Sequence, residues 1–333
     1  MRKGIMTGLC ALFFIAFPAA PALAQELLVG GQAVGIQIST DGVIVAGLCP
    51  VETEAGTVTP AEDAGLKTGD LICGADGEPV SDASGLIAAL EEAGDQVELE
   101  VRRGKQTLSL QVATAVGEEG RPMLGILLRD GLNGIGTLTF CDPDSGVFGA
   151  LGHSINDSAT GLAVPLREGS VTDARIVAVH PGTAGTPGEL DGVSDLSQVL
   201  GSVEQNTEVG IFGHMSDALG SRPVEIGVIT AGPASILSTV EGREAQEFQV
   251  EINRVYRDSD GTHAMFSVTD PALLGRTGGI VQGMSGSPIL QNGRLVGAVT
   301  HVLVDDPKCG FAVFADRMYE QCESLPHTLE RAG

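Results

Sequence analysis

The sequence predicts a mainly β protein with a small N-terminal domain and a larger C-terminal domain. Hydrophobic residues make up 43% of the 333 residues and aromatic residues only 4%, so the cores must consist mainly of Val, Ile, Leu and Ala. The 47 glycines are spread between short runs rich in Val, Ile and Thr, a pattern typical of strands joined by tight turns. A polar segment with Gly and Pro at 116–123 predicts a linker between two cores, for which the chain is long enough.

The first 24 residues carry the three parts of a secretory signal peptide. Arg2 and Lys3 provide positive charge, an apolar run follows at 8–17, and the small-x-small motif at 22–24 is a cleavage site. The run is short for a membrane span, and an uncleaved anchor is the alternative. We therefore expect residues 1–24 to direct export of the protein across the cytoplasmic membrane.

Residues 26–115 predict a small α/β domain. Ser81 and Asp82 are the expected N-cap of its main helix, and Gly65 ends a short helical turn. In chain order the predicted elements are strands at 34–38 and 42–47, a helical turn at 61–64, a strand from 71, a helix at 86–92, and hairpin arms at 97–102 and 106–112.

The motif A-x-x-A-G-L-x-x-G-D-x-I at 61–72, together with this order of elements, resembles a PDZ domain, which is a small, partly open barrel. Val34, Gly35 and Ile36 match the hydrophobic-Gly-hydrophobic loop of that family. The resemblance implies that this loop binds the terminal carboxylate of an extended peptide that adds to the sheet edge. The ligand is expected to be a separate peptide or a part of this chain. An ordinary strand start is the alternative interpretation of these three residues.

Residues 124–325 predict a second, all-β domain, either a barrel or a sandwich. Turn residues separate its apolar runs throughout, and the segment 316–322 is the clearest helix. The predicted strands lie at 136–140, 174–179, 209–212, 224–229, 248–255, 265–268, 295–304 and 311–314.

A glycine-rich loop around Ser285 is the strongest candidate for chemistry. A serine hydroxyl needs exposure, a nearby base and hydrogen-bond donors for the oxyanion before it acts as a nucleophile. Gly283 and Gly286 permit a sharp turn, and the N–H groups of Gly283 and Ser285 are the candidate oxyanion donors. The loop resembles G-D-S-G-G-P of chymotrypsin-like peptidases and departs from it at Met284 and Ser287. A simple Gly/Ser turn is the alternative.

A histidine is the expected base, and an acidic residue should orient it. His153 is favoured because small residues flank it at the end of a predicted hairpin strand, and His301, close to the serine loop, is its main rival. The residues alone leave the acid open between Asp270, Asp157 and Asp142. The other histidines are His180, His214, His263 and His327.

The second domain resembles the SpoIVB family of sporulation serine peptidases, which also have a PDZ domain before the peptidase domain. The stretches that carry the resemblance are 134–140, 149–155, 210–213, 269–271, 277–289 and 297–302. The resemblance implies a chymotrypsin-like double β-barrel and a triad of His153, Asp270 and Ser285. It also implies a role in the sigma-K checkpoint. There the peptidase enters the space between the forespore and mother-cell membranes, cleaves a membrane-bound regulator and also cleaves itself.

Composition argues against other classes. The net charge of −24 excludes the basic surface that nucleic acids require. We expect no cofactor and no metal, since the sequence has no His-Glu-x-x-His motif and no zinc-type Cys/His spacing. Besides Cys10, five cysteines remain, and their pairing stays open. The alternatives are a general quality-control peptidase of the HtrA type, in which the PDZ domain follows the peptidase domain, and a non-catalytic peptide-binding protein with an inactive peptidase domain.

Overall fold

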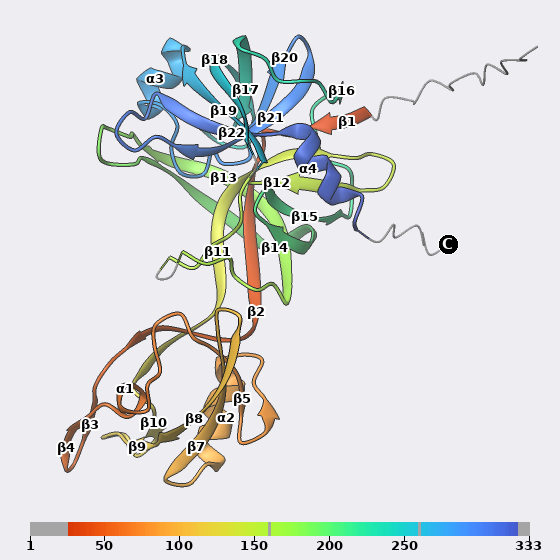
Figure 1. The fold of residues 1–333 in the computed structure, drawn as a ribbon. Coiled ribbons are helices and arrows are strands. Elements are labelled where there is room, and N and C mark those ends of the chain that lie inside the picture. Colours follow the sequence, from red (N-terminus) through yellow and green to blue (C-terminus); the bar gives the residue numbers. More distant parts are fainter. Residues whose placement is uncertain (1–25, 159–160, 259–260, 326–333) are drawn as a thin grey trace, which may run out of the picture.

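The computed structural model describes residues 26–158, 161–258 and 261–325, so the predicted signal peptide at 1–24 lies outside it. Figure 1 shows the C-terminal β-barrel at the top, the first β-barrel below it, and a smaller domain at the bottom. No helix in the described ranges is long and apolar enough to span a membrane. The five cysteines in these ranges are free thiols.

The C-terminal barrel is closed by six strands around a core of aliphatic and aromatic side chains such as Phe248, Phe266 and Ile289. In order around the barrel they are β17 (Gly232–Ser238), β18 (Gln246–Asp258), β19 (Gly261–Val268), β22 (Cys309–Phe314), β21 (Arg294–Val302) and β20 (Pro288–Gln291). Two helices flank it, α3 (Pro271–Thr277) and α4 (Ala315–Cys322).

The pairings of six other strands close the first barrel, because β11 pairs with β2 at one end of the series as well as with β12 at the other. The order is β11 (Ile126–Cys141), β12 (Val147–Ala150), β15 (Gly210–Met215), β14 (Glu189–Thr207), β13 (Glu168–His180) and β2 (Ala33–Leu48). At the edge β1 (Glu26–Val29) pairs with β11 and with β16 (Pro223–Glu225). The predicted double β-barrel is confirmed.

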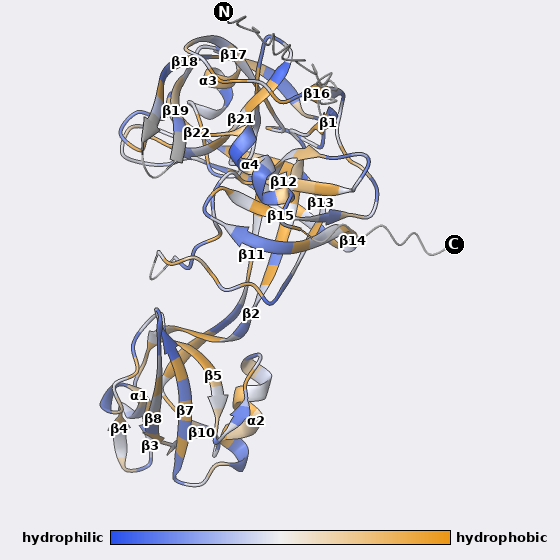
Figure 2. Cartoon of the chain, turned by 45° about the vertical axis from the view of Figure 1, so that its right-hand side comes forward, coloured by the Kyte–Doolittle hydropathy of each residue, from blue (hydrophilic) through white to orange (hydrophobic). Residues whose placement is uncertain are grey.

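The PDZ domain is N-terminal to most of the peptidase domain, as predicted, but it is inserted into the first barrel between the barrel halves of β2 and β11. Its elements are β3 (Val51–Thr53), β4 (Gly56–Val58), α1 (Pro60–Asp63), β5 (Leu71–Ala75), β6 (Glu78–Pro79), α2 (Ala83–Glu92), β7 (Gln96–Arg103), β8 (Gln106–Ala113), β9 (Ala115–Val116) and β10 (Pro122–Met123). Figure 2 shows that β2 and β11 connect it to the barrels. Each of these two strands runs from one domain into the other. Leu48 of β2 pairs with Ile126 of β11 in the PDZ domain, and Ala33 of β2 pairs with Thr137 of β11 in the first barrel.

The domain boundaries in the structure therefore differ from the division into 26–115, 116–123 and 124–325. Residues 26–39 belong to the first barrel, and the segment predicted as a linker contains the β9–β10 hairpin. The physical reason is that β2 runs unbroken through Gly42, which adopts a φ of +124°. The polar residues 39–42, Ser-Thr-Asp-Gly, predict a turn between two strands, whereas β2 continues through them at the point where it changes domain.

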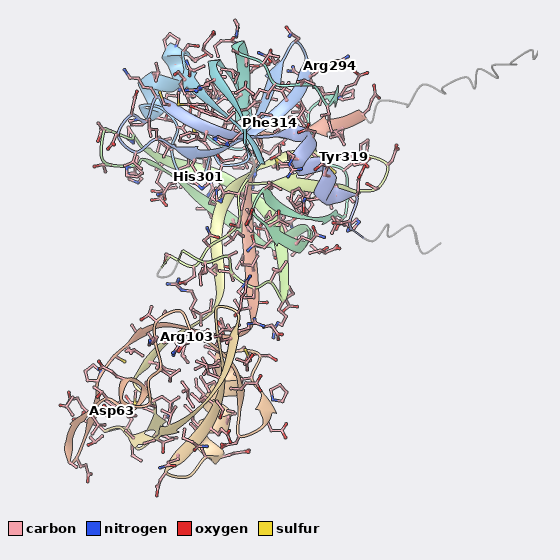
Figure 3. The ribbon with its side chains drawn as sticks, in the orientation of Figure 1. Asp63, Arg103, Arg294, His301, Phe314 and Tyr319 are labelled. Carbon is pink, nitrogen blue, oxygen red and sulfur yellow. The ribbon has the colours of Figure 1, made fainter. Side chains whose placement is uncertain are left out.

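The signature residues of the PDZ motif have clear structural roles. Asp70 is buried, and its carboxylate accepts two hydrogen bonds of 2.6 Å from Nε and Nη2 of Arg103. This forked pairing joins the start of β5 to the end of β7. Figure 3 labels Arg103, on the side of the PDZ domain that faces the barrels. The predicted helix cap is confirmed, because Asp82 accepts a 2.8 Å hydrogen bond from the Gly85 N–H.

Candidate active site

The Ser285 loop is held against the first barrel by hydrogen bonds to strand β11. The hydroxyl of Thr137 donates to the Gly283 carbonyl at 2.9 Å, and the Thr137 N–H donates to the Ser285 carbonyl at 3.0 Å. The hydroxyl of Thr139 donates to the Gly286 carbonyl at 2.7 Å. Three carbonyl oxygens of the loop are thus drawn to β11, which fixes the orientation of the turn between the two barrels.

Two glycines make this turn possible. Gly283 and Gly286 have φ angles of +96° and +93°, in the left-handed region that glycine adopts at little cost. In the part of the chain that the structure describes, the N–H groups of Gly283 and Ser285 have no hydrogen-bond acceptor. These two donors are therefore available to a ligand oxygen, as an oxyanion hole requires.

The two residues before His153, Leu151 and Gly152, bring its loop into contact with the serine loop. Leu151 and Gly152 both have left-handed φ angles, +68° and +70°, which is unusual for a bulky residue such as leucine. A Cβ atom on Gly286 would lie 2.4 Å from the Leu151 nitrogen, so the two loops are in backbone contact. Backbone strain of this kind is concentrated at functional sites.

The tautomer of His153 follows from its hydrogen bond. Its Nδ1 lies 2.7 Å from the Ser154 carbonyl oxygen, which can only accept, so Nδ1 carries the proton and Nε2 is left as the basic nitrogen. Burial lowers the pKa of His153 below its ordinary value of 6.5, and the bond to Ser154 only partly opposes this. The ring is therefore kept neutral, as a general base must be.

The nucleophile and base are not hydrogen-bonded to each other. Ser285 Oγ donates instead to the Thr300 carbonyl at 2.8 Å. Thr300 is followed by His301, whose ring centroid lies 4.7 Å from that of His153. Figure 3 shows His301 in the region where the two barrels meet. Burial, and then the proximity of His153, lower the pKa of His301 as well.

Asp270 is not brought to His153. One carboxylate oxygen accepts from the N–H groups of Ala272 and Leu273 at 2.8 and 3.2 Å, and the other from the Gln249 N–H at 3.2 Å. Desolvation opposes ionisation of the carboxyl, but the three N–H groups outweigh it and lower the pKa of Asp270. The residue is the N-cap of α3. In the described residues no hydrogen bond or ion pair joins it to His153.

The other acidic residues and histidines that the sequence offered for the triad form interactions elsewhere. Asp157 pairs with Arg129 at 3.0 Å, and Asp142 accepts from the Ser145 hydroxyl at 2.7 Å. His180 pairs with Asp191, and His214 with Glu204, each at 2.7 Å. His263 stacks on Tyr256, and His327 lies outside the described residues.

A cavity of about 510 Å³ opens beside His153 and His301, whose rings are tilted by 32° to each other, between the barrels and α4. Its polar lining includes His153, His263, Thr300, His301, Glu208 and Arg317. Thr137, Thr139 and Thr300, which position the serine, are not among the site residues that the sequence predicts. They lie in the stretches 134–140 and 297–302 that carry the family resemblance, but their local sequence gives them no individual role because their partners are remote in the chain.

The predicted carboxylate-binding loop of the PDZ domain is not a loop. Val34, Gly35 and Ile36 lie in the first half of β2, paired with β11 on one side and with β13 on the other. Both edges of this stretch are occupied, so its N–H groups are not free to receive a peptide carboxylate. The alternative interpretation, a strand in a sheet, describes what the structure contains.

Comparison with known proteins places these features in a family. The double barrel with a glycine-turned serine loop defines a serine peptidase of chymotrypsin-like fold. Residues 120–319 match the SpoIVB peptidase S55 family, and residues 34–114 match the PDZ domain family. The chain belongs to the SpoIVB peptidase S55 family of serine peptidases.

The individual proteins that resemble this chain match it over only part of its length or at low sequence identity. The putative serine protease HhoA of Synechocystis is 40% identical over 77 residues, 22% of this chain and 18% of HhoA, so the chain spans under a fifth of that relative. The PDZ domain of an SdrC-like protein from Listeria monocytogenes is 28% identical over 27% of this chain and 90% of its own, with a TM-score of 0.22. The active form of the Rv3671c protease from M. tuberculosis is 16% identical over 60% of this chain and 76% of its own, with a TM-score of 0.35.

Asp270 has two competing roles, the helix cap that its hydrogen bonds support and the triad acid that the family resemblance implies, and Asp270→Asn and Asp270→Ala distinguish them. Because asparagine also caps helices, the cap role predicts that Asp270→Asn keeps peptidase activity within a few-fold, and that Asp270→Ala lowers the free energy of unfolding by about 1 kcal/mol. Peptide hydrolysis and thermal unfolding measure the two effects. A loss of about 10⁴-fold in turnover for Asp270→Asn would instead make Asp270 the triad acid that the family resemblance implies.

The lowered pKa of His153 predicts the pH profile. A base that stays neutral at lower pH keeps the enzyme active there, so the midpoint of the acid limb of kcat/KM should lie below 6.5. Replacing His180, which is exposed and paired with Asp191, by glutamine should leave the profile unchanged. An acid limb centred above 6.5 would contradict the assignment of His153 as the base.

Proposed function

We propose that the chain is an exported signalling endopeptidase with Ser285 as nucleophile and His153 as general base. The observation that carries the proposal is the fixed serine loop, which leaves the N–H groups of Gly283 and Ser285 without an acceptor beside a neutral histidine. Serine peptidases need these three components together.

The proposed reaction begins when the Ser285 hydroxyl leaves the Thr300 carbonyl and turns to Nε2 of His153. The oxygen attacks the scissile carbonyl carbon while its proton passes to Nε2, and the oxyanion is held by the N–H groups of Gly283 and Ser285. Collapse of this intermediate breaks the C–N bond, and His153 returns the proton to the departing amine. Water then releases the acyl group by the same steps, which restores Ser285.

The orientation of the base differs from that of a carboxylate-held histidine. In the described arrangement the Ser154 carbonyl holds Nδ1, and it stabilises an imidazolium less than an ionised carboxylate does. The arrangement is thus that of a resting enzyme, and binding of an extended substrate would complete it. Asp270 as third member of the triad stays a prediction.

The signalling role has support of a different kind. The signal-peptide pattern of residues 1–24 supports export of the peptidase, and the sporulation resemblance implies a membrane-associated regulator as substrate. Insertion of the PDZ domain into the first barrel distinguishes the chain from quality-control peptidases of the HtrA type, in which that domain follows. We propose that it cleaves few substrates, one of them a membrane-bound regulator.

A fluorophosphonate probe tests the catalytic part. We expect labelling of the full chain at Ser285, located by mass spectrometry, and its loss in His153→Ala. Labelling that survives this change, or no labelling at all, would contradict the proposal and, in the second case, favour a non-catalytic peptide-binding protein.

Identification of new N-termini tests the signalling part. Membranes from the producing cells are incubated with the full chain or with Ser285→Ala, and the cleavage products are compared. A small set of sites in membrane-associated proteins is expected. Broad degradation of unfolded proteins would instead indicate quality control.

A further inference from the structure

The first residues of β11 add an antiparallel strand to one edge of the PDZ half of β2. Ile126 to Arg129 pair antiparallel with residues 44–48 of β2, and β5 occupies the other edge of β2. Extended peptides bind PDZ domains by adding such a strand next to a helix. Helix α2 is that neighbour here, since it contacts both β2 and β11.

Side chains of this segment alternate between the PDZ core and solvent, as those of a bound peptide do. Leu124 is 2% exposed and belongs to the PDZ core together with Leu86 and Leu90 of α2. Ile126 and Leu128 pack against the same core. Leu127, between them, is 56% exposed.

Backbone and polar contacts fix both ends of the segment. The Leu124 carbonyl accepts from the Ala61 N–H at 2.9 Å, and the Gly125 carbonyl accepts from the Cys49 N–H at 2.9 Å. At the other end the Asp130 carboxylate accepts a 2.8 Å hydrogen bond from the Ala83 N–H, in the first turn of α2. A carboxylate is favoured at a helix N-terminus, so this contact stabilises the end of the segment against α2.

We propose that residues 124–130 are an internal ligand that fills the peptide groove of the PDZ domain. The partner that fits this groove is an extended peptide with apolar side chains at alternate positions and a carboxylate at its end. Such a peptide must displace the segment. Because the segment is covalently attached, its effective concentration at the groove is of millimolar order or higher, and a free peptide competes poorly.

The strand geometry allows this exchange without opening the barrel. The register of β11 against β2 shifts between Leu127 and Leu128 and again between Arg129 and Gly131. Bulges of this kind interrupt the ladder and separate the pairing on either side. Residues 131–137 have their own pairing with β2, so residues 124–130 can leave while the first barrel stays closed.

Competition by a synthetic peptide tests the proposal. The probe is fluorescein-labelled Leu-Gly-Ile-Leu-Leu-Arg-Asp with a free C-terminus, added to the full chain carrying Ser285→Ala so that nothing is cleaved. We expect weak binding to this chain and at least tenfold tighter binding when Leu128→Glu weakens the internal segment. Leu127→Glu, one residue away on the exposed face, is the matched control and should bind as weakly as the parent.

Equal affinity of the parent and the Leu128→Glu chain would overturn the proposal, and so would failure of the folded Leu128→Glu chain to bind. Hydrogen exchange on the unaltered sequence gives a second measurement should Leu128→Glu not fold. Amides of 124–130 should be protected, and an excess of the peptide should increase their exchange but not that of 131–137. Exchange of 124–130 at the rate of an unstructured peptide, or without response to the peptide, would contradict the internal ligand.

Discussion

Replacing Ser285 by alanine should lower peptide-bond hydrolysis by about 10⁴-fold or more while leaving the fold intact. The alanine removes the attacking oxygen, and loss of a triad nucleophile leaves only the catalysis provided by substrate binding and the oxyanion donors. In the described residues the hydroxyl makes a single hydrogen bond, to the Thr300 carbonyl, so the cost in stability should be small. Turnover of a labelled peptide and thermal unfolding measure the two quantities.

Ser287 provides a matched control in the same loop. Its side chain is fully buried, and its hydroxyl has no hydrogen-bond partner in the described residues. Ser287→Ala removes the same atom two positions along and replaces an unsatisfied polar group by an apolar one, so activity and stability should both be retained. If the two variants lost activity equally, the loop would be structural and its serine would not be the nucleophile.

Gly286→Ala should also strongly lower both activity and stability, because the added Cβ atom has no room. A Cβ atom at this position would lie 2.1 Å from the Thr137 carbonyl oxygen and 2.4 Å from the Leu151 nitrogen, both backbone atoms that cannot move alone. The residue also has a φ of +93°. We expect a loss of about 2–4 kcal/mol in the free energy of unfolding and at least about 100-fold in turnover, because the loop must shift away from β11.

Gly293→Ala is a control that separates the effect of backbone strain from the effect of steric contact. It also has a left-handed φ, +76°, but no atom lies within 4 Å of the position of its Cβ. Gly293→Ala therefore measures the backbone strain alone, about 1–2 kcal/mol, with activity retained. A loss in Gly286→Ala no larger than in Gly293→Ala would show that the contact between the serine loop and the first barrel is not tight.

The sequence predicted features that depend on local pattern and missed those that depend on remote contacts. The glycines around Ser285 and the cap at Asp82 are local signals, and the structure contains both a sharp turn and a capped helix there. Thr137 and Gly283, by contrast, are joined across 146 positions of the chain. No local pattern marks the threonine that holds a loop so far away.

Asp270 illustrates a signal with two meanings. An aspartate before a proline is a frequent helix start, since proline suits the first helical position. The family resemblance gives the same aspartate a place in a triad. In the structure three backbone N–H groups of its own surroundings hold the carboxylate, so the local meaning accounts for its position.

The insertion of the PDZ domain also predicts an order of assembly during synthesis. Strand β2 emerges from the ribosome long before β13, its neighbour in the first barrel at residues 168–173. Closing a long loop to pair such remote strands is slow. The PDZ domain, complete once residue 129 has emerged, lays β11 beside β2 in the correct register. The remaining pairs, up to Thr137 with Ala33, can then form one after another along the two strands. We therefore expect the inserted domain to act as a template on which the catalytic barrel begins to fold.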